Sequence, residues 1–184
     1  NSNAPGVEIN PNLSWEVNVL YTHPLIEKAI ECGVKKFIFA SSGSVYGIKK
    51  EKNVTEDLNL VPISAYNKTK MIAERVIMSF KDNIKTYCIR PATVCGFSPK
   101  MRLDLTVNLL TMQALTKKSI TVFGGKQTRP TINTHDMVRV YNHFLSKNNI
   151  KPDYYNAGFE NYSIMKIAKI IAKKFDCKII SVNS

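Results

Sequence analysis

A short apolar run followed at once by a serine-rich turn constrains the fold of this chain more than any other stretch. Residues 37–40 (Phe-Ile-Phe-Ala) show no polar alternation, which is typical of a strand covered on both faces in a parallel sheet. The run ends in Ser41-Ser42-Gly43-Ser44. In open α/β sheets, ligands bind outside the carboxyl ends of the strands, so hydroxyl groups directly after such a strand face a cleft. We therefore expect an α/β protein with a functional site at this turn.

A helix is expected to follow the turn, beginning after a cap at Ser64 and extending to about Lys81. Tyr66 and Lys70 lie four residues apart and so share one face of it. A phenol of ordinary pKa about 10 is a poor base, but a neighbouring ammonium favours its ionised form. With Ser42 as a second hydrogen-bonding group, this set suits the removal of a proton from a carbinol while a hydride leaves to a nicotinamide ring.

The Tyr-x-x-x-Lys spacing by itself carries little information. In a chain with 8 tyrosines and many lysines, chance predicts about one such pair, and the sequence contains three: Tyr46/Lys50, Tyr66/Lys70 and Tyr162/Lys166. Only Tyr66/Lys70 follows a buried strand and a serine turn and also opens a helix. The context therefore selects this pair.

Four motifs occur in order along the chain: residues 41–47 (SSGSVYG), 66–70 (YNKTK), 90–96 (RPATVCG) and 129–133 (RPTIN). Together they resemble the extended short-chain dehydrogenases/reductases. Within this group the chain is most similar to the NAD-dependent epimerase/dehydratase family acting on nucleotide sugars, with UDP-glucose 4-epimerase as the type.

The resemblance implies a set of site residues. It makes Ser42, Tyr66 and Lys70 catalytic, with Tyr66 as base and then acid and Lys70 as its electrostatic partner and a ribose ligand. It implies NAD as cofactor, contacted by Asn18, Tyr66, Lys70 and Pro91. It implies a nucleotide-diphosphate sugar as substrate, contacted by Ser42, Ser44, Thr93 and Arg129.

Three of these assignments have plainer alternatives, and a fourth departs from the family pattern. Asn18 is equally well a polar residue on a helix, since a single asparagine carries little information. Ser44 could only cap the turn. Arg129 could be a surface arginine, although a planar bidentate donor suits a diphosphate. Thr93 stands where relatives often have an asparagine, which leaves the sugar contacts open.

The leading function implied by the resemblance is epimerisation, in which a hydride passes from a sugar carbon to NAD and returns to the opposite face. The alternatives are a nucleotide-sugar reductase or dehydratase with the same three residues. Dehydratases of the family follow the catalytic hydroxyl with an acidic pair, whereas Gly43 and Ser44 stand here. Dehydration is therefore disfavoured, and reduction stays open.

The resemblance implies a first βαβ unit with a glycine-rich turn that cradles a pyrophosphate at a helix N-terminus. No such turn is present in this sequence, and Gly124-Gly125 lacks a following helix of the needed kind. We therefore expect an internal fragment. It would form a partial Rossmann-like, doubly wound parallel sheet lacking its first βαβ units, with part of a small C-terminal substrate lobe. Residues 1–98 would belong to the NAD-binding half, and residues 99–184 to the lobe and the last Rossmann strand. An alternative is that the chain as given is a non-catalytic fragment, with an exposed strand edge at Phe37.

Composition bears on partners and location. The net charge of +12 comes from scattered lysines without interleaved aromatic residues, so nucleic acid is not expected as a partner. No apolar run approaches the roughly 20 residues that span a bilayer. No charged start followed by an apolar region suggests a signal peptide either, so a cytoplasmic location is expected. The four cysteines are dispersed and the three histidines show no metal spacing, which favours reduced thiols and no metal. The family resemblance, and not the composition, implies a homodimer for the full-length protein.

The remaining elements follow from periodicity and capping signals. Residues 1–10 form a polar lead-in. A helix over residues 13–32 should be kinked or divided near residues 21–23 by Pro24 and end at Gly33. Helices are also expected at 104–115, at 135–145 capped by Thr134, and at 164–175 capped by Ser163 with Ile167, Ile170 and Ile171 inward, and strands at 86–91, 120–123, 131–133, 154–159 and 177–182.

Overall fold

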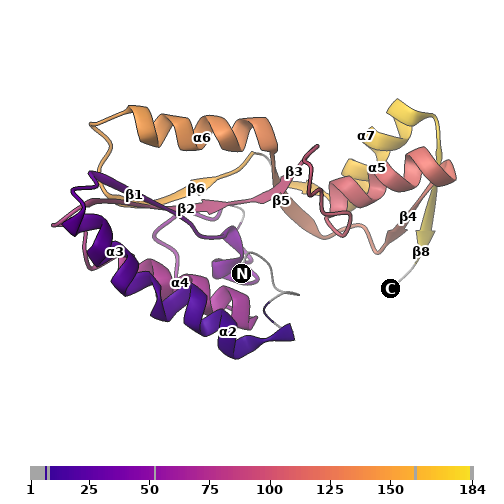
Figure 1. Cartoon of the computed structure of the whole chain (residues 1–184). Coiled ribbons are helices and arrows are strands. Elements are labelled where there is room, and N and C mark those ends of the chain that lie inside the picture. The colour runs from indigo at the N-terminus through magenta and orange to yellow at the C-terminus, as the bar shows by residue number, and fades with distance from the viewer. Residues whose placement is uncertain (1–6, 8, 52, 160, 183–184) are drawn as a thin grey trace. The chain divides into compact units, whose positions relative to one another are not determined.

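A computed structural model of the protein describes residues 7, 9–51, 53–159 and 161–182. The chain forms two compact units (Figure 1). Unit 1 comprises Asn1–Pro91 and Arg139–Ala157, and unit 2 comprises Ala92–Val138 and Gly158–Ser184. The polar lead-in lies largely outside the described residues. The functional division expected at residue 98 stays a prediction.

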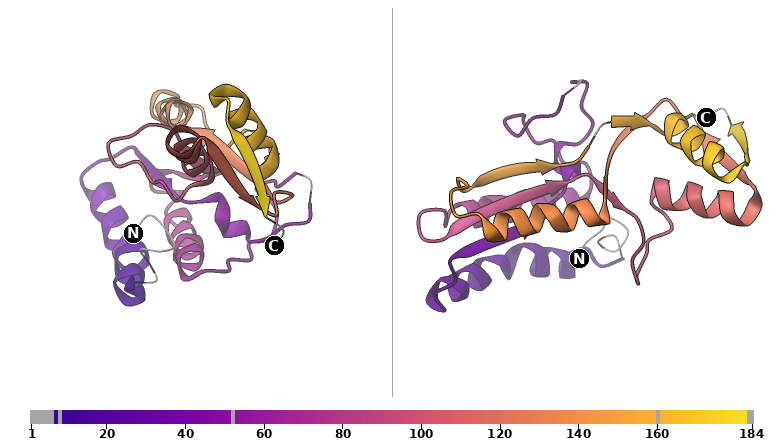
Figure 2. Two further views of the ribbon diagram at one scale, coloured as in Figure 1. Left: turned by 90° about the vertical axis from the view of Figure 1, so that its right-hand side faces the viewer. Right: turned by 90° about the horizontal axis from the view of Figure 1, so that it is seen from above.

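Unit 1 is built on a parallel sheet of three strands, seen side by side in Figure 2. The strands β1 (Lys36–Ala40), β2 (Lys85–Pro91) and β6 (Asp153–Ala157) lie in the order β1-β2-β6. Phe39 pairs with Cys88, which pairs with Tyr154. This sheet confirms the α/β fold class, and among the described residues it leaves β1 at an edge, as expected from Phe37.

Helices cover both faces of this sheet (Figure 1). On one face lie α2 (Pro11–Trp15), the π-helix η1 (Glu16–Leu20), α3 (Thr22–Glu31) and α4 (Ala65–Met78), and on the other lies α6 (Thr134–Ser146), which begins in unit 2 and ends in unit 1. Because strand side chains alternate, Cys88 packs with Ile26 and Ile77 toward α3 and α4. Its neighbour Tyr87 instead meets Phe144 of α6, with ring centroids 5.2 Å apart. The unit is therefore doubly wound.

The first helical stretch is divided where Pro24 predicts. η1, which continues α2, ends at Leu20, and α3 begins at Thr22. The division falls here because Pro24 has no backbone N–H to donate to the carbonyl oxygen of Leu20, as a continuous α-helix would need. Gly33 follows α3 with φ of +74° and donates its N–H to the carbonyl oxygen of Ile30, as expected of a C-terminal cap.

Among its described residues, unit 2 contains two small sheets, two complete helices and the first residues of α6. β3 (Thr93–Cys95), β5 (Thr128–Asn133) and β7 (Asn161–Ser163) form one sheet in that order, and β4 (Ser119–Phe123) pairs in parallel with β8 (Lys178–Val182). α5 (Thr106–Lys117) and α7 (Ile164–Phe175) enclose the core with β4. This core contains Leu110, Ile120, Val122, Ile167 and Ile171.

Four local predictions have different outcomes. Ser64 and Ser163 cap α4 and α7 as expected, each accepting a backbone N–H. At α6, however, it is the side chain of Asn133 that accepts the N–H of His135, because the hydroxyl of Thr134 donates to the carbonyl oxygen of Cys95. Ile170 is 54% exposed rather than inward, since the buried face of α7 is confined to residues such as Ile167 and Ile171.

Other strands differ from their expected bounds. The short strands β3 and β7 were missed, and β6 begins at Asp153 and ends at Ala157 rather than at Phe159. Within the described ranges, no helix combines the length and the apolar character needed to cross a membrane.

Candidate active site

Lys70 lies against the end of β1. Its Nζ donates a hydrogen bond to the carbonyl oxygen of Ala40 at 3.0 Å and lies 4.7 Å from the centroid of the Phe39 ring. The side chain is 9% exposed, so the ammonium is held at the carboxyl end of the strand and does not extend into solvent. Burial lowers the pKa of Lys70, and the nearby carboxylate of Glu74 opposes this effect.

Tyr66 lies one turn before Lys70 on α4, with its ring centroid 5.9 Å from the Nζ of Lys70. The ring is half-buried. Sequence reasoning missed a second phenol: burial raises the pKa of Tyr141 on α6, with a smaller contribution from the charge of Tyr66. Tyr141 is thus near enough to Tyr66 to interact with it electrostatically. No sequence signal indicated this proximity, because Tyr141 is an isolated tyrosine in a helical pattern.

The serine turn forms a short 3-10 helix, η2 (Gly43–Tyr46), directly after β1. Ser42 caps it, accepting the N–H of Ser44 at 3.2 Å. The turn is therefore capped by Ser42 and not, as considered above, by Ser44. The reason is that the Oγ of Ser44 donates to the Oδ1 of Asn67 at 2.6 Å.

The hydroxyls of Ser42 and Ser44 and the amide of Asn67 form a chain of hydrogen bonds, called here the relay. The Oγ atoms of Ser42 and Ser44 are 2.7 Å apart. Since the single hydroxyl proton of Ser44 is directed to Asn67, the proton of Ser42 is the one shared between the serines. Asn67 follows Tyr66 on α4, so the relay brings the serine turn against the first turn of the helix that carries Tyr66 and Lys70.

Gly43 and Pro91 fix the position of this turn on β2. A Cβ atom at Gly43 would lie 3.1 Å from the carbonyl oxygen of Pro91, so the close approach of the two backbones depends on glycine. The end of β2, where Pro91 is expected to face the cofactor, thus lies directly beside the residues that follow Ser42.

Asn18 is buried, with 6% of its surface exposed, and lies in η1. Its Nδ2 donates to the Oγ1 of Thr69 at 3.2 Å, and that hydroxyl donates to the carbonyl oxygen of Tyr66 at 2.8 Å. Asn18 therefore supports the first turns of α4 and is not simply a surface polar residue. π-Helical turns are frequent at functional sites, and the contact of Asn18 with a cofactor stays a prediction.

Thr93 and Arg129 belong to unit 2. Thr93 is half-buried at the start of β3 and pairs with Thr131 of β5. Arg129 is exposed on β5, opposite Tyr162 of β7, and within the part of the chain that the structure describes its side chain makes no hydrogen bond or ion pair. Its guanidinium is thus available to an anion.

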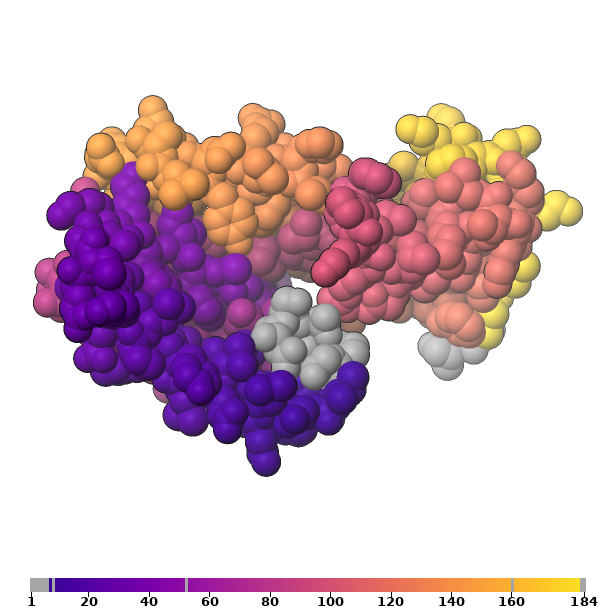
Figure 3. Space-filling view, viewed as in Figure 1, coloured from indigo at the N-terminus to yellow at the C-terminus, as the bar shows by residue number. Residues whose placement is uncertain are grey.

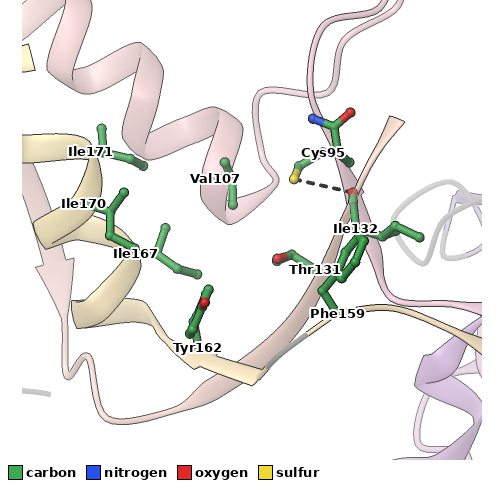
Figure 4. Close-up of a pocket in the computed structure, with 10 residues that line it drawn as sticks. Cys95, Val107, Thr131, Ile132, Phe159, Tyr162, Ile167, Ile170 and Ile171 are labelled. Atoms are coloured by element: carbon green, nitrogen blue, oxygen red, sulfur yellow. Dashed lines mark hydrogen bonds between the residues drawn. The ribbon is translucent and has the colours of Figure 1, made fainter. Parts of the chain in front are cut away.

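Unit 2 also contains an open cavity of about 520 Å³, shown in Figure 4. Its lining is mostly apolar and comes from β5, from α7 and from the segment around β7, including Thr131, Phe159, Tyr162, Ile167 and Ile170. Sequence reasoning missed it because the isoleucine periodicity of α7 predicts only a core face.

Comparison with known proteins agrees with these observations. The model of the NAD dependent epimerase/dehydratase family matches residues 3–158. With a parallel, doubly wound sheet and a serine turn beside a Tyr-x-x-x-Lys helix, the fold and site define a short-chain dehydrogenase/reductase-type protein. More particularly, the chain belongs to the NAD dependent epimerase/dehydratase family, which confirms the resemblance seen in its motifs.

Individual relatives are similar over part of their length. The chain is 33% identical over 158 residues to an uncharacterized UDP-glucose epimerase of Bacillus subtilis, covering 84% of this chain and 49% of that protein. It is 29% identical over 180 residues to a UDP-glucose 4-epimerase of Lactobacillus helveticus, covering 84% of this chain and 54% of that protein. The chain thus spans about half the length of these relatives.

Among solved structures, the UDP-glucuronic acid 4-epimerase of Bacillus cereus in complex with UDP-glucuronic acid and NAD is 30% identical. The match has a TM-score of 0.76 and covers 91% of this chain and 55% of that chain.

The residues around the serine turn fit one end of NAD. The Lys70 ammonium has three N–H donors and gives one to Ala40, which leaves donors for ribose hydroxyls. Within the described ranges, the Oγ of Ser41 is buried and has no hydrogen-bond partner, which is unusual for a polar atom. For the pyrophosphate, which joins the two halves of NAD, this sequence has no glycine-rich turn at a helix N-terminus.

Proposed function

We propose that the protein is an NAD-dependent epimerase of nucleotide-diphosphate sugars, in which Tyr66 moves the proton of a sugar hydroxyl. The observation that carries the proposal is the buried ammonium of Lys70, bound to Ala40 at the carboxyl end of β1 and one turn from Tyr66. A cation in a poorly solvated position favours the phenolate form of a neighbouring tyrosine more strongly than a solvated one does.

In this proposal Tyr66 accepts the proton of the sugar hydroxyl as the C–H bond on the same carbon breaks and a carbonyl forms. NAD, when bound, supplies the chemistry of accepting the hydride and returning it to the opposite face. Tyr66 then gives the proton back to the carbonyl oxygen. Lys70 stabilises the phenolate, and Ser42 rotates its hydroxyl from Ser44 to donate to the same sugar oxygen.

Arg129 and Thr93 are proposed to bind the substrate, Arg129 through the diphosphate. The exposed guanidinium of Arg129 supports this assignment, because its planar donors match phosphate oxygens. Ser44 is proposed to contact the sugar while bound to Asn67. Asn18 and Pro91 are proposed to lie beside the cofactor.

Epimerisation is favoured over dehydration by the geometry of the turn. A dehydratase of the family needs an acidic pair after the catalytic hydroxyl. Here the position after Ser42 is Gly43, where even a Cβ atom would crowd the carbonyl oxygen of Pro91. A carboxylate-bearing residue at this place would therefore require the Pro91 carbonyl to shift by a few tenths of an ångström, and a reductase is the alternative to be distinguished.

The test uses protein expressed from its complete reading frame and UDP-glucose or UDP-glucuronic acid carrying deuterium at the reacting carbon. Conversion with retained deuterium and no net consumption of cofactor is expected, whereas stoichiometric consumption of reduced cofactor would identify a reductase. Tyr66→Phe should lower kcat by about 10²–10⁴-fold. Tyr155→Phe, which removes a hydroxyl bound to the carbonyl oxygen of Lys151, should leave turnover unchanged. Full activity in Tyr66→Phe would refute the proposal.

We further propose that the protein forms a homodimer. Five exposed apolar side chains follow one another at near-helical spacing along α2, η1 and α3, the indigo segment of Figure 3; they are Leu13, Val17, Leu20, Tyr21 and Leu25. Sedimentation velocity should show a dimer that Leu20→Glu dissociates. A cytoplasmic location is proposed from four cysteines that are all free.

The 184 residues by themselves are proposed to be inactive, because the sequence has no glycine-rich turn to bind the pyrophosphate of NAD. Calorimetry should detect no NAD binding in the micromolar range, and turnover should be absent. Measured turnover by these residues would overturn this statement.

A further inference from the structure

A buried chain of hydrogen bonds joins the serine turn to α4 in unit 1. Nε and Nη2 of Arg90 donate to the two carboxylate oxygens of Glu74 at 2.9 and 2.7 Å, and both side chains are almost fully buried, at 3% and 1% exposure. Nη1 of Arg90 donates to the hydroxyl of Tyr46 at 2.8 Å. That hydroxyl in turn donates to the Oδ1 of Asn156 at 2.8 Å. Four elements thus meet at the Arg90 guanidinium.

The same network holds the loop that follows the turn. The backbone N–H of Asn156 donates to the Oε1 of Glu56 at 2.7 Å, and its Nδ2 donates to the carbonyl oxygen of Val54 at 2.9 Å. The guanidinium of Arg90 also lies 5.0 Å from the ring centroid of Tyr46 and 4.5 Å from that of Tyr154. Stacking and a bidentate fork together fix the plane of the group, which a lysine could not reproduce.

The serine turn is therefore attached to α4 at two points. At one end Ser44 binds Asn67, and at the other Tyr46 reaches Glu74 through Arg90. Asn67, Lys70 and Glu74 are spaced at i, i+3 and i+7, so they share one face of the helix. The two attachments lie one turn before and one turn after Lys70. They span the stretch of helix that carries the ammonium.

We propose that Arg90, with Glu74 and Tyr46, is a positioning residue that fixes the distance between the Ser42 hydroxyl and the Tyr66–Lys70 pair. The inference rests on the proposed catalytic function of Ser42, Tyr66 and Lys70. Because Arg90 and Glu74 compensate each other, the network sets a position without adding a net charge beside Lys70.

A contribution to folding stability alone is a weak reason for a protein to bury an ion pair such as Arg90 and Glu74. Replacing a buried ion pair by apolar residues of similar volume is often neutral or stabilising, because the desolvation of two charges offsets their attraction. A directional contact that must hold a reacting group within a fraction of an ångström is, in contrast, a good reason to bury one. The branch from Arg90 to Tyr46 has this directional character, since it ends two residues after Ser44 in the turn itself.

Tyr46→Phe is the most selective test, because it removes both hydroxyl bonds and keeps the ring. The amides of Val45 and Gly47, which donate to the carbonyl oxygens of Ser42 and Ser44 at 3.2 and 3.1 Å, report on opening of the turn. Their hydrogen exchange should accelerate about ten-fold, while exchange in β2 stays unchanged. Tyr155→Phe, the matched loss of one bound hydroxyl elsewhere in unit 1, should change neither.

Kinetics of protein from the complete reading frame supply the second arm. Tyr46→Phe and Arg90→Lys should lower kcat about ten-fold or more with KM within about two-fold, because the substrate still binds while the turn is displaced. Unchanged exchange at Val45 and Gly47 overturns the proposal whatever the activity. Faster exchange at these amides in Tyr46→Phe with an unchanged kcat overturns it too. The inactivity of Tyr66→Phe shows in that case that the proposed function itself still holds. Absence of wild-type turnover refutes the proposed function, and exchange then still decides whether the network anchors the turn.

Discussion

The buried pair of Glu74 and Arg90 yields the most quantitative prediction. Glu74→Gln keeps the shape of the side chain and removes its charge, so Arg90 remains buried at 3% exposure without a counter-charge. Hydrogen bonding and the charge of Glu74 hold the pKa of Arg90 above its usual value in spite of burial, so the guanidinium cannot escape the penalty by losing a proton.

The expected loss is large. Removing one partner of a buried ion pair costs about 3–5 kcal/mol, because the remaining charge is desolvated and unpaired. Domains are stable by only about 5–15 kcal/mol, and for chains of about this length each kcal/mol corresponds to roughly 2–4 °C in Tm. Glu74→Gln should therefore lower the Tm of the protein by roughly 6–20 °C. The double variant Glu74→Gln, Arg90→Met should recover at least about 2 kcal/mol, since no charge stays buried.

Urea unfolding followed by tryptophan fluorescence reports on unit 1, because the single tryptophan, Trp15, lies in α2. Glu31→Gln is the matched control, since Glu31 pairs with Lys28 at 2.8 Å on the surface, where both side chains are more than 60% exposed. Its effect should be within about 0.5 kcal/mol. A Glu74→Gln variant as stable as Glu31→Gln, or additive losses in the double variant, would refute the reasoning.

Three other perturbations have expected outcomes. As pH rises from neutral through the lowered pKa of Lys70 toward 10.5, the folded state releases its proton first, so wild type should gain stability relative to Lys70→Met in urea titrations. Gly47→Ala should cost at least about 2 kcal/mol, since φ is +73° and a Cβ would collide with the carbonyl oxygen of Val61; Gly33→Ala, at +74° in open space, should cost less. Lys36→Met should cost about 1–2 kcal/mol, because Nζ binds the carbonyl oxygens of Phe144, Leu145 and Lys147 at the end of α6; thermal melts against exposed Lys173→Met check this.

Local signals predicted most of the fold. The uniformly apolar run at Phe37 predicted a doubly covered parallel strand, and Ser64 and Ser163 predicted two helix starts, because each signal acts within a few residues of its effect. The three-residue strand β7 was missed since it is too short to show a period. Asn133 and not Thr134 caps α6, and the hydroxyl of Thr134 instead donates to the carbonyl oxygen of Cys95, which lies 39 positions away in the sequence.

The site was predictable where its residues follow one another and hidden where they do not. The serine turn and the Tyr66 helix are contiguous motifs, so their parts could be named from the sequence. The hydrogen bonds that join these motifs could not be predicted from the sequence, because their partners lie far apart in it. Ser44 and Asn67 are separated by 23 positions, and Tyr46 and Asn156 by 110. One signal was available, since Glu74 shares a face of α4 with Lys70, four residues before it, and with Ile77, three residues after it. A buried carboxylate in such a place requires a cation, and Arg90 on the next strand is the candidate.

The comparison of Tyr66/Lys70 with Tyr162/Lys166 shows why spacing does not define this chemistry. In both pairs the lysine follows the tyrosine by four residues near the start of a helix, and the ammonium of Lys166 is in fact closer to the ring of its tyrosine, at 3.9 Å against 5.9 Å from the centroid. Lys166 is exposed, however, and rests on the ring face, where a cation interacts with π electrons and is screened by water.

Lys70 is instead 9% exposed and tied to the Ala40 oxygen at the end of a strand. The low local polarity lets its charge act on a phenol oxygen. The spacing makes two residues neighbours, and the strand and turn that precede them supply the desolvated environment in which the pair can do acid–base work.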